Sequence, residues 1–112
     1  MKRLEKGAQN LATVRKCGHI YVPYRVLKSD EIGKYADVMY DDSTDAVRVL
    51  VITGDDIKGR AVVYETSGVS VHIKPLYSQL GWLPQQRSYK VPVVIKEDSF
   101  EFILKKDLHQ SI

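Results

Sequence analysis

The chain has 112 residues, of which 44% are apolar and 28% are charged, and its formal net charge is +3. This apolar content is enough for a packed core and excludes a wholly disordered chain. The length fits one compact domain or two very small interlocked ones. No apolar run reaches the roughly 20 residues of a membrane-spanning helix, and the first residues lack the apolar region of a signal peptide. We therefore expect a cytoplasmic protein.

Positive and negative charges are segregated along the chain. Residues 1–28 carry seven Lys and Arg but only one acidic residue, whereas residues 29–56 carry two Lys and Arg and eight Asp and Glu. This segregation predicts one basic and one acidic surface, and a basic surface attracts phosphate groups. A solvated surface without a ligand is the alternative interpretation.

The first half of the chain reads as two β-hairpins on either side of a short helix. Apolar and polar residues alternate before and after Cys17-Gly18, which predicts a hairpin with glycine in the turn. Pro23 ends the second strand because it has no amide hydrogen for a ladder, and Gly33 is suited to end the helix. The predicted elements are strands at 12–16 and 19–22, a helix at 24–31, and strands at 35–40 and 46–52.

The second half repeats this order. The predicted elements are strands at 59–65 and 69–73, a helix at 76–80, and strands at 91–95 and 100–104. We therefore divide the chain into a basic arm at 1–11, a hairpin-helix-hairpin repeat at 12–54, a divergent repeat at 59–105 interlocked with the first, and a tail at 106–112. A chance similarity between two hairpin-rich halves is the alternative.

The first repeat resembles a known family. The string VRKCGHIYVPYRVL, followed by IGKYADVMYDD, is similar to the AbrB/SpoVT family of swapped-hairpin DNA-binding domains, which includes the MazE antitoxins. That family shows a basic strand, a Gly turn, an apolar strand ending in Pro, a short helix ending in an apolar-Gly pair, and a second hairpin. The second repeat is less similar, because its strand at 69–73 lacks the final Pro unless Pro75 replaces it.

The resemblance implies a mostly β fold with short helices, namely a swapped-hairpin AbrB-like β-barrel that is internally duplicated. Tandem two-copy members of the MraZ type have that architecture. The second repeat would then complete the fold within one chain. The resemblance also implies a homodimer and binding to double-stranded DNA.

The resemblance places the DNA-contacting residues in the first repeat. Arg15 and Lys16 match the basic pair of its first strand, and Lys28 matches a basic position late in its helix. His19 stands where the family has Arg, and the helix of this chain adds a tyrosine and an arginine of its own. Arg contacts guanine with two hydrogen bonds, whereas Lys more often positions on phosphate. The candidate DNA-binding residues are Arg15, Lys16, His19, Tyr24, Arg25 and Lys28.

Patterns for catalysis or metal binding are missing from the sequence. Cys17 stands alone, and the three histidines have no Cys or carboxylate at ligand spacing. The acidic pairs 41–42 and 97–98 fall in predicted turns, where such residues are ordinary. There is no Gly-rich phosphate loop and no nucleophile elbow. We expect no enzyme activity, no cofactor and no metal.

The sequence therefore predicts a DNA-binding transcriptional regulator that contacts duplex DNA through its basic first hairpin. Three alternatives stay open. One is a protein-interaction module that does not bind DNA, because fold does not fix function. Another is an antitoxin-like protein that binds a protein partner. The third is an architectural protein that coats DNA without sequence preference.

Overall fold

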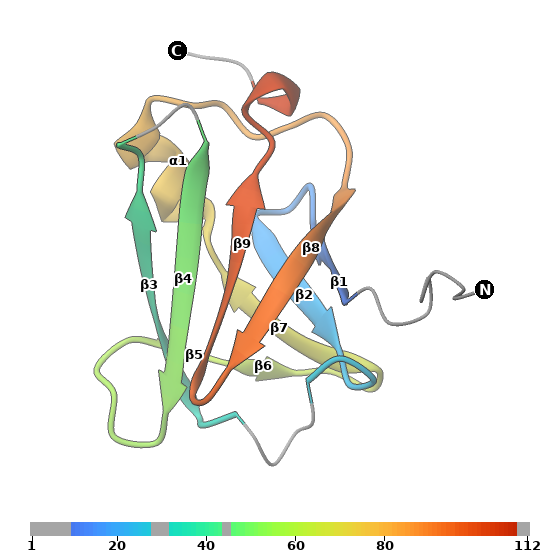
Figure 1. Ribbon diagram of the computed structural model, residues 1–112, viewed down its shortest axis with the longest axis vertical. Coiled ribbons are helices and arrows are strands. Elements are labelled where there is room, and N and C mark those ends of the chain that lie inside the picture. The colour runs from blue at the N-terminus through green and yellow to red at the C-terminus, as the bar shows by residue number, and fades with distance from the viewer. Residues whose placement is uncertain (1–9, 28–31, 44–45, 110–112) are drawn as a thin grey trace, which may run out of the picture.

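The computed structural model describes residues 10–27, 32–43 and 46–109 of the chain. This part is mostly β-structure with one short α-helix (Figure 1). The elements are β1 (Leu11–Val14), β2 (His19–Pro23), β3 (Tyr35–Asp41), β4 (Val47–Gly54), β5 (Arg60–Ala61), β6 (Val63–Tyr64), β7 (Gly68–His72), α1 (Lys74–Leu80), β8 (Tyr89–Lys96), β9 (Ser99–Leu104) and the 3-10 turn η3 (Lys106–Leu108).

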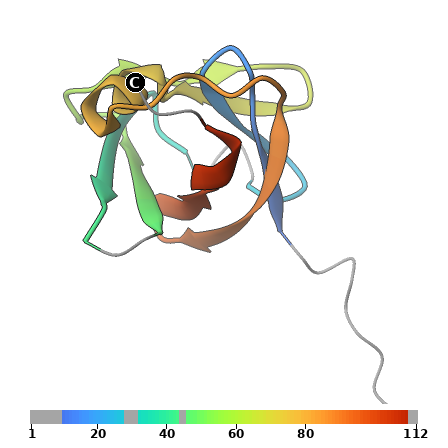
Figure 2. The same ribbon diagram turned by 90° about the horizontal axis from the view of Figure 1, so that it is seen from above.

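All the described strands belong to one antiparallel sheet that curls into a nearly closed barrel (Figure 2). The strand order is β5-β3-β4-β9-β8-β1-β2-β7-β6. The two ends of this order, β5 and β6, are separated in the chain by Val62 alone. The amide of Val62 donates a hydrogen bond of 2.8 Å to the carbonyl of Lys34, beside the start of β3. One interrupted strand therefore brings the two edges of the sheet together.

The two halves of the chain alternate around this barrel. The β1–β2 hairpin lies between β8 and β7, and the β3–β4 hairpin lies between β5 and β9. The register places Ile20 opposite Val71 and Val49 opposite Phe102. Neither half forms the sheet without the other, so the molecule has a single shared core.

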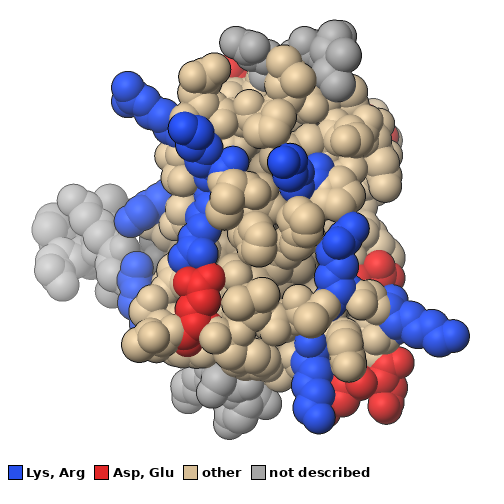
Figure 3. Space-filling model, turned by 180° about the vertical axis from the view of Figure 1, so that it is seen from behind, with Lys and Arg blue, Asp and Glu red and all other residues tan. Residues whose placement is uncertain are grey.

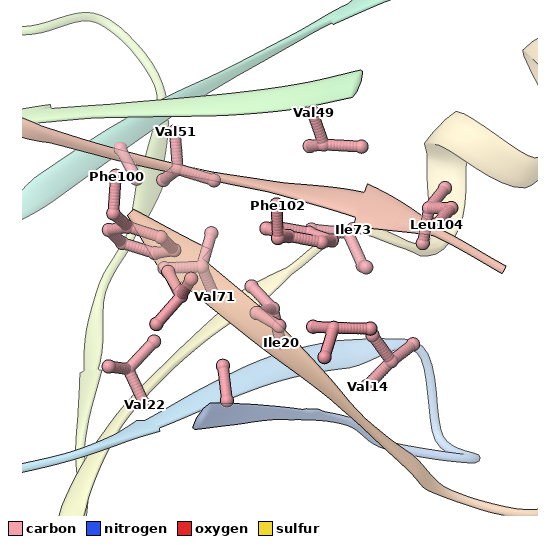
Figure 4. Close-up of a cluster of buried hydrophobic side chains, with 14 of the residues drawn as sticks. Val14, Ile20, Val22, Val49, Val51, Val71, Ile73, Phe100, Phe102 and Leu104 are labelled. Carbon is pink, nitrogen blue, oxygen red and sulfur yellow. The ribbon is translucent and has the colours of Figure 1, made fainter. Parts of the chain in front are cut away.

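The core consists of the inward-facing side chains of these strands, most of them β-branched (Figure 4). Strands place successive side chains on opposite faces, so every second residue of β2 and β4 is buried. Burial of such a side chain stabilises the fold by about 1.5–3 kcal/mol before entropy is counted. The fully buried set includes Val14, Ile20, Val22, Val49, Val51, Val69, Val71, Ile73, Phe100 and Leu104.

The turn of the first hairpin packs against the start of α1. Gly18 has φ +91°, and its carbonyl accepts a hydrogen bond of 2.8 Å from the amide of Ile73. A Cβ atom at Gly18 would lie 2.6 Å from the Cβ of Lys74. Pro75 stands in the first turn of α1, and Gly81 ends the helix with φ 73°. The turn at Gly18 therefore needs glycine both for its backbone angle and for this close approach.

Most of the predicted elements are confirmed. The hairpins β1–β2 and β3–β4, the helix between Pro75 and Gly81, and the hairpin β8–β9 form where the patterns predicted them. The predicted tail at 106–112 begins with the 3-10 turn η3. Most of the predicted N-terminal arm, residues 1–9, lies outside the described residues.

Two predicted elements were wrong in the described residues. Residues 24–27 form a turn and not the first part of a helix, and in this turn the amides of Val26 and Leu27 both donate to the carbonyl of Pro23. The remainder of that predicted helix, 28–31, lies outside the described residues. The predicted strand at 59–65 is interrupted at Val62, which is buried and donates to Lys34 instead of continuing the ladder.

The two glycines with positive φ give a matched test of the contact between the turn and α1. Gly81→Ala places a methyl group in open space, so it should cost only the backbone strain of about 1–2 kcal/mol. Gly18→Ala has the same kind of strain and in addition forces Lys74 away, so its loss of unfolding free energy should be clearly larger. Urea denaturation of both variants measures the difference. Equal losses would contradict the close packing at Gly18.

Candidate nucleic-acid interface

Arg15 is held by a carboxylate from the second half of the chain. Its guanidinium lies 4.2 Å from the ring centroid of Tyr21 and makes two hydrogen bonds to Glu65, of 2.7 Å from Nη1 to Oε2 and 3.0 Å from Nη2 to Oε1. Both side chains are about one third exposed. These hydrogen bonds raise the pKa of Arg15 and lower the pKa of Glu65. The charge of Arg15 is therefore balanced, and its planar donor edge is occupied.

Two tyrosines attach this cluster to the turn between β6 and β7. The hydroxyl of Tyr21 is hydrogen-bonded to the hydroxyl of Ser67. The hydroxyl of Tyr24 donates to the backbone carbonyl of Glu65 at 2.8 Å. Tyr24, a predicted DNA contact, also packs against the core with part of its ring. Its hydroxyl therefore positions the same turn that carries the partner of Arg15.

Lys16 and Lys74 both lie at the turn of the first hairpin, Lys16 within the turn and Lys74 against its Gly18. Lys16 is exposed, and its backbone amide donates to Ser88 Oγ at 3.0 Å. Lys74 is exposed at the start of α1, and its Cβ, Cγ and Cδ pack against Gly18. Among the residues that the structure describes, the ion pairs are Arg15–Glu65 and Lys96–Glu101, so both ammonium groups remain available.

His19 and His72 continue this basic region along β2 and β7. They are directly opposite each other in the ladder, and their rings stack with centroids 5.1 Å apart and an interplanar angle of 19°. Burial lowers the pKa of His72, and the charges of Arg60, His19 and Lys74 lower it further. Arg60, His19 and Lys74 therefore place their positive charge around His72 on one region of the barrel surface.

We call this region the basic surface. It comprises Arg15, Lys16, His19, Arg60, His72 and Lys74. It lies on the side of the barrel where α1 and the β1–β2 turn are found, away from the β8–β9 hairpin (Figure 2). Figure 3 shows this side from behind, with Lys and Arg side chains spread across it and most of the visible acidic side chains gathered toward one corner.

The structure brings three of the six predicted DNA-binding residues onto the basic surface, and a fourth, Tyr24, contacts Glu65 beside Arg15. Arg15, Lys16 and His19 share the basic surface. Arg25 is exposed after the end of β2, so this strand separates it from Lys16. Lys28 lies outside the described residues. Sequence reasoning missed Arg60, His72 and Lys74, because folding alone brings them to this region. The pairing of β2 with β7 places His72 opposite His19, the packing of Gly18 on α1 places Lys74 at the turn, and Arg60 on β5 acts on His72 through its charge.

A groove adjoins the basic surface between β3 and α1. Its volume is about 400 Å³, and Arg60 and His72 line it together with Asp37. Apolar side chains from both elements, among them Val38 and Leu76, form the rest of its wall. It contains no grouping of nucleophile, base and orienting residue. Likewise, no three His, Cys, Asp or Glu residues gather at metal-binding distance within 10–27, 32–43 and 46–109.

Comparisons of this chain with models of protein families, with curated proteins and with solved structures find no match. In the described part of the chain, no helix has the length and apolar character needed to cross a membrane. The function therefore has to be argued from the geometry of the chain itself.

A second cluster, which the sequence did not predict, surrounds His109. Its ring is 7% exposed and lies 4.8 Å from the ring centroid of Tyr77, 5.0 Å from that of Trp82 and 5.6 Å from that of Tyr89. Burial raises the pKa of Tyr89 to about 12, so its hydroxyl is protonated and donates to His109 Nε2 at 2.7 Å. His109 Nδ1 then donates to the carbonyl of Leu83 at 3.3 Å. These bonds fix a neutral imidazole and attach the segment after β9 to the barrel.

This cluster predicts a loss of stability on acidification. Burial lowers the pKa of folded His109 below the ordinary value of about 6.5, so the unfolded chain takes up the proton first. The unfolding free energy should therefore be highest above about pH 6.5 and decrease as the pH falls through that value. Melting temperatures measured at pH 7.5 and 5.5 test this.

The variant His109→Phe keeps an aromatic ring but does not titrate, so its melting temperature should fall less between the two pH values. His72 adds a smaller loss of the same sign in both proteins, since its pKa is also lowered. An equal fall in wild type and variant would show that His109 is not responsible.

Proposed function

We propose that this protein is a DNA-binding regulator that contacts duplex DNA through the basic surface. The observation that carries the proposal is the pair of exposed ammonium groups on Lys16 and Lys74, beside the stacked His19 and His72. Clustered cations bind phosphates and release the counterions that surround DNA. The β1–β2 hairpin also has a suitable width, because the major groove of DNA admits a two-stranded β-ribbon.

The individual side chains have different roles in this proposal. Lys16 and Lys74 bind phosphates and position the hairpin, since phosphate contacts fix orientation without reading sequence. Arg15 and Arg60 are the side chains able to form two hydrogen bonds with guanine, but the donors of Arg15, the arginine of the first hairpin, are bound to Glu65. Reading a base with Arg15 therefore requires that Glu65 releases it.

The strand order supports the further proposal of a duplicated swapped-hairpin barrel related to the AbrB/SpoVT family. If the two halves are equivalent, β1 corresponds to β5 and β6 together, β2 to β7, β3 to β8, and β4 to β9. The neighbours β2–β7 and β4–β9 are then equivalent strands of the two halves, and the neighbours β1–β8 in the sheet are equivalent to β3–β5. The turn at 24–27 follows β2 as α1 follows β7. The match in sequence remains confined to the first repeat.

We also propose a cytoplasmic homodimer as the working form, since two basic surfaces would bind a polyanion more tightly than one.

A second candidate function, DNA binding without sequence preference, is supported by the kind of cation on the basic surface. With Arg15 held by Glu65, the cations of the basic surface left free among the described residues are Lys16, Lys74 and Arg60, a mainly lysine set that suits an architectural protein that binds DNA of any sequence. Competition of a labelled genomic site against bulk DNA separates the two. A protein-interaction module would give no DNA binding at all, whereas an antitoxin-like role is a mixed case that adds a protein partner.

Removal of the two lysines should weaken DNA binding without loss of the fold. The double variant Lys16→Ala, Lys74→Ala should bind duplex DNA at least about tenfold more weakly at low salt. The slope of log affinity against log salt should fall by about 0.9 for each lost phosphate contact. Fluorescence anisotropy titrations at several salt concentrations measure both. Unchanged affinity would contradict the proposal.

The matched control is Lys96→Ala. Lys96 lies on the β8–β9 hairpin and carries the same charge, but it pairs with Glu101 away from the basic surface. Its removal changes the net charge by the same amount as a single lysine variant of the basic surface. A control that lost as much affinity as Lys16→Ala would show that net charge, and not the basic surface, determines binding.

Glu65→Gln tests the role assigned to Arg15. The substitution keeps the shape of the side chain and removes the charge that balances Arg15, so the basic surface gains one uncompensated cation. DNA affinity should rise several-fold at low salt, and the salt slope should steepen by about 0.9. The control Glu97→Gln, which removes an exposed carboxylate in the turn between β8 and β9, should leave both quantities unchanged. An affinity for DNA that stays constant in Glu65→Gln would place Arg15 outside the interface.

A further inference from the structure

The outer face of β3, β4, β9 and β8 carries a cluster of apolar side chains among charged ones, although it points away from the core. In a sheet with one solvated face, the outward residues are normally polar. Here Met39, Leu50 and Val94 lie in one row across the strands, with Glu101 between the last two. Met39 is 44% exposed, Val94 53%, and Ile103 in the adjacent row 50%. An exposed apolar patch of this kind marks an interaction site.

This face also has a hollow beside Ile103. The hollow has a volume of about 360 Å³, and it lies over β8 and β9 where the two strands carry Pro92, Val94 and Ile103. Arg48, Glu101 and Lys105 are charged members of its wall. Its size and lining suit an aliphatic side chain with polar groups around it.

The charges along β9 identify the partner. Glu101 and Ile103 face outward on alternate residues, and Lys105 follows at the same spacing just after the strand ends. A two-fold axis through Ile103 reverses this order in a second copy. Lys105 of each chain would then face Glu101 of the other, while the two Ile103 side chains meet at the axis. An interface formed by the same patch on both chains has to be self-complementary in this way.

We propose that this face binds a second copy of the chain, with the two sheets packed face to face about Ile103. Glu101 and Lys105 can form this ion pair between chains because neither is held by a strong ion pair within the described part of its own chain. Glu101 now pairs with Lys96 at 3.3 Å, and Lys96 is half exposed, so that surface ion pair is weak. Lys105 is exposed and lies 5.7 Å from the ring centroid of Tyr89. Contact between the sheets would bury Met39 and Val94 as well.

The proposed dimer has a consequence for the basic surface. β4, β9 and β8 lie at the front of the barrel in Figure 1, and α1 and the β1–β2 turn lie on the opposite side (Figure 2). A dimer joined at the front would therefore present its two basic surfaces on opposite sides, where they would engage two segments of a long duplex. This inference rests on the homodimer of the proposed function, but its test is made without DNA, so it can fail while DNA binding by the basic surface stands.

The experiment is sedimentation equilibrium of the full chain without DNA. The wild type should dimerise, and Ile103→Glu should raise the dimer dissociation constant at least about tenfold, because two carboxylates would meet at the axis. Val63→Glu is the matched control, since Val63 is 45% exposed on β6 and lies outside this face. Circular dichroism confirms that each variant is folded. A wild type that stays monomeric at its highest soluble concentration would overturn the proposal and assign the face to another partner.

A charge exchange tests the predicted register. Glu101→Lys alone and Lys105→Glu alone should each weaken the dimer, because like charges would then face each other. The double variant Glu101→Lys, Lys105→Glu should restore the dimer to within a few-fold of wild type. Failure of the double variant to recover dimerisation would overturn the antiparallel arrangement about Ile103.

Discussion

The pairing of β2 with β7 is the contact on which the rest of the molecule depends. It joins the two halves of the chain by a ladder that runs from His19 opposite His72 to Pro23 opposite Gly68. On its inner side it adds buried valines to the core, and on its outer side it stacks the two histidines. Loss of this ladder would break the core and disperse the basic surface together. Stability and the proposed function are therefore tied to one interaction.

The surface chemistry of the barrel follows from the alternation of its strands. Inward residues meet in one core, so outward residues are free to differ from one side to the other. Around β2 and β7 they include His19, Tyr21 and His72, whereas on β4, β9 and β8 exposed apolar side chains stand among charged ones. The net charge of +3 conceals this difference, because it averages over both sides of the barrel.

The sequence predicted the features that depend on neighbouring residues. Alternation and the glycine turn predicted the β1–β2 hairpin, and Pro75 with Gly81 predicted α1. Pro23 ends β2 as predicted, where it stands opposite Gly68, but the described residues that follow it form a turn and not a helix. For the site, local charge identified Arg15 but not its partner Glu65, which is 50 residues away. Such partners are fixed by register across the sheet, which no local pattern encodes.

The contrast between Arg15 and Lys16 separates two kinds of basic residue that look equivalent in the chain. Lys16 keeps a mobile, hydrated ammonium group, which suits a phosphate whose position varies. The side chain of Arg15 is already held in one direction by its contacts with Tyr21 and Glu65, so binding a new partner costs less side-chain entropy. That partner must, however, displace the carboxylate of Glu65. Glu65 therefore determines how much positive charge the first hairpin offers. Because Glu65 comes from the second half, that half controls the surface it helps to build.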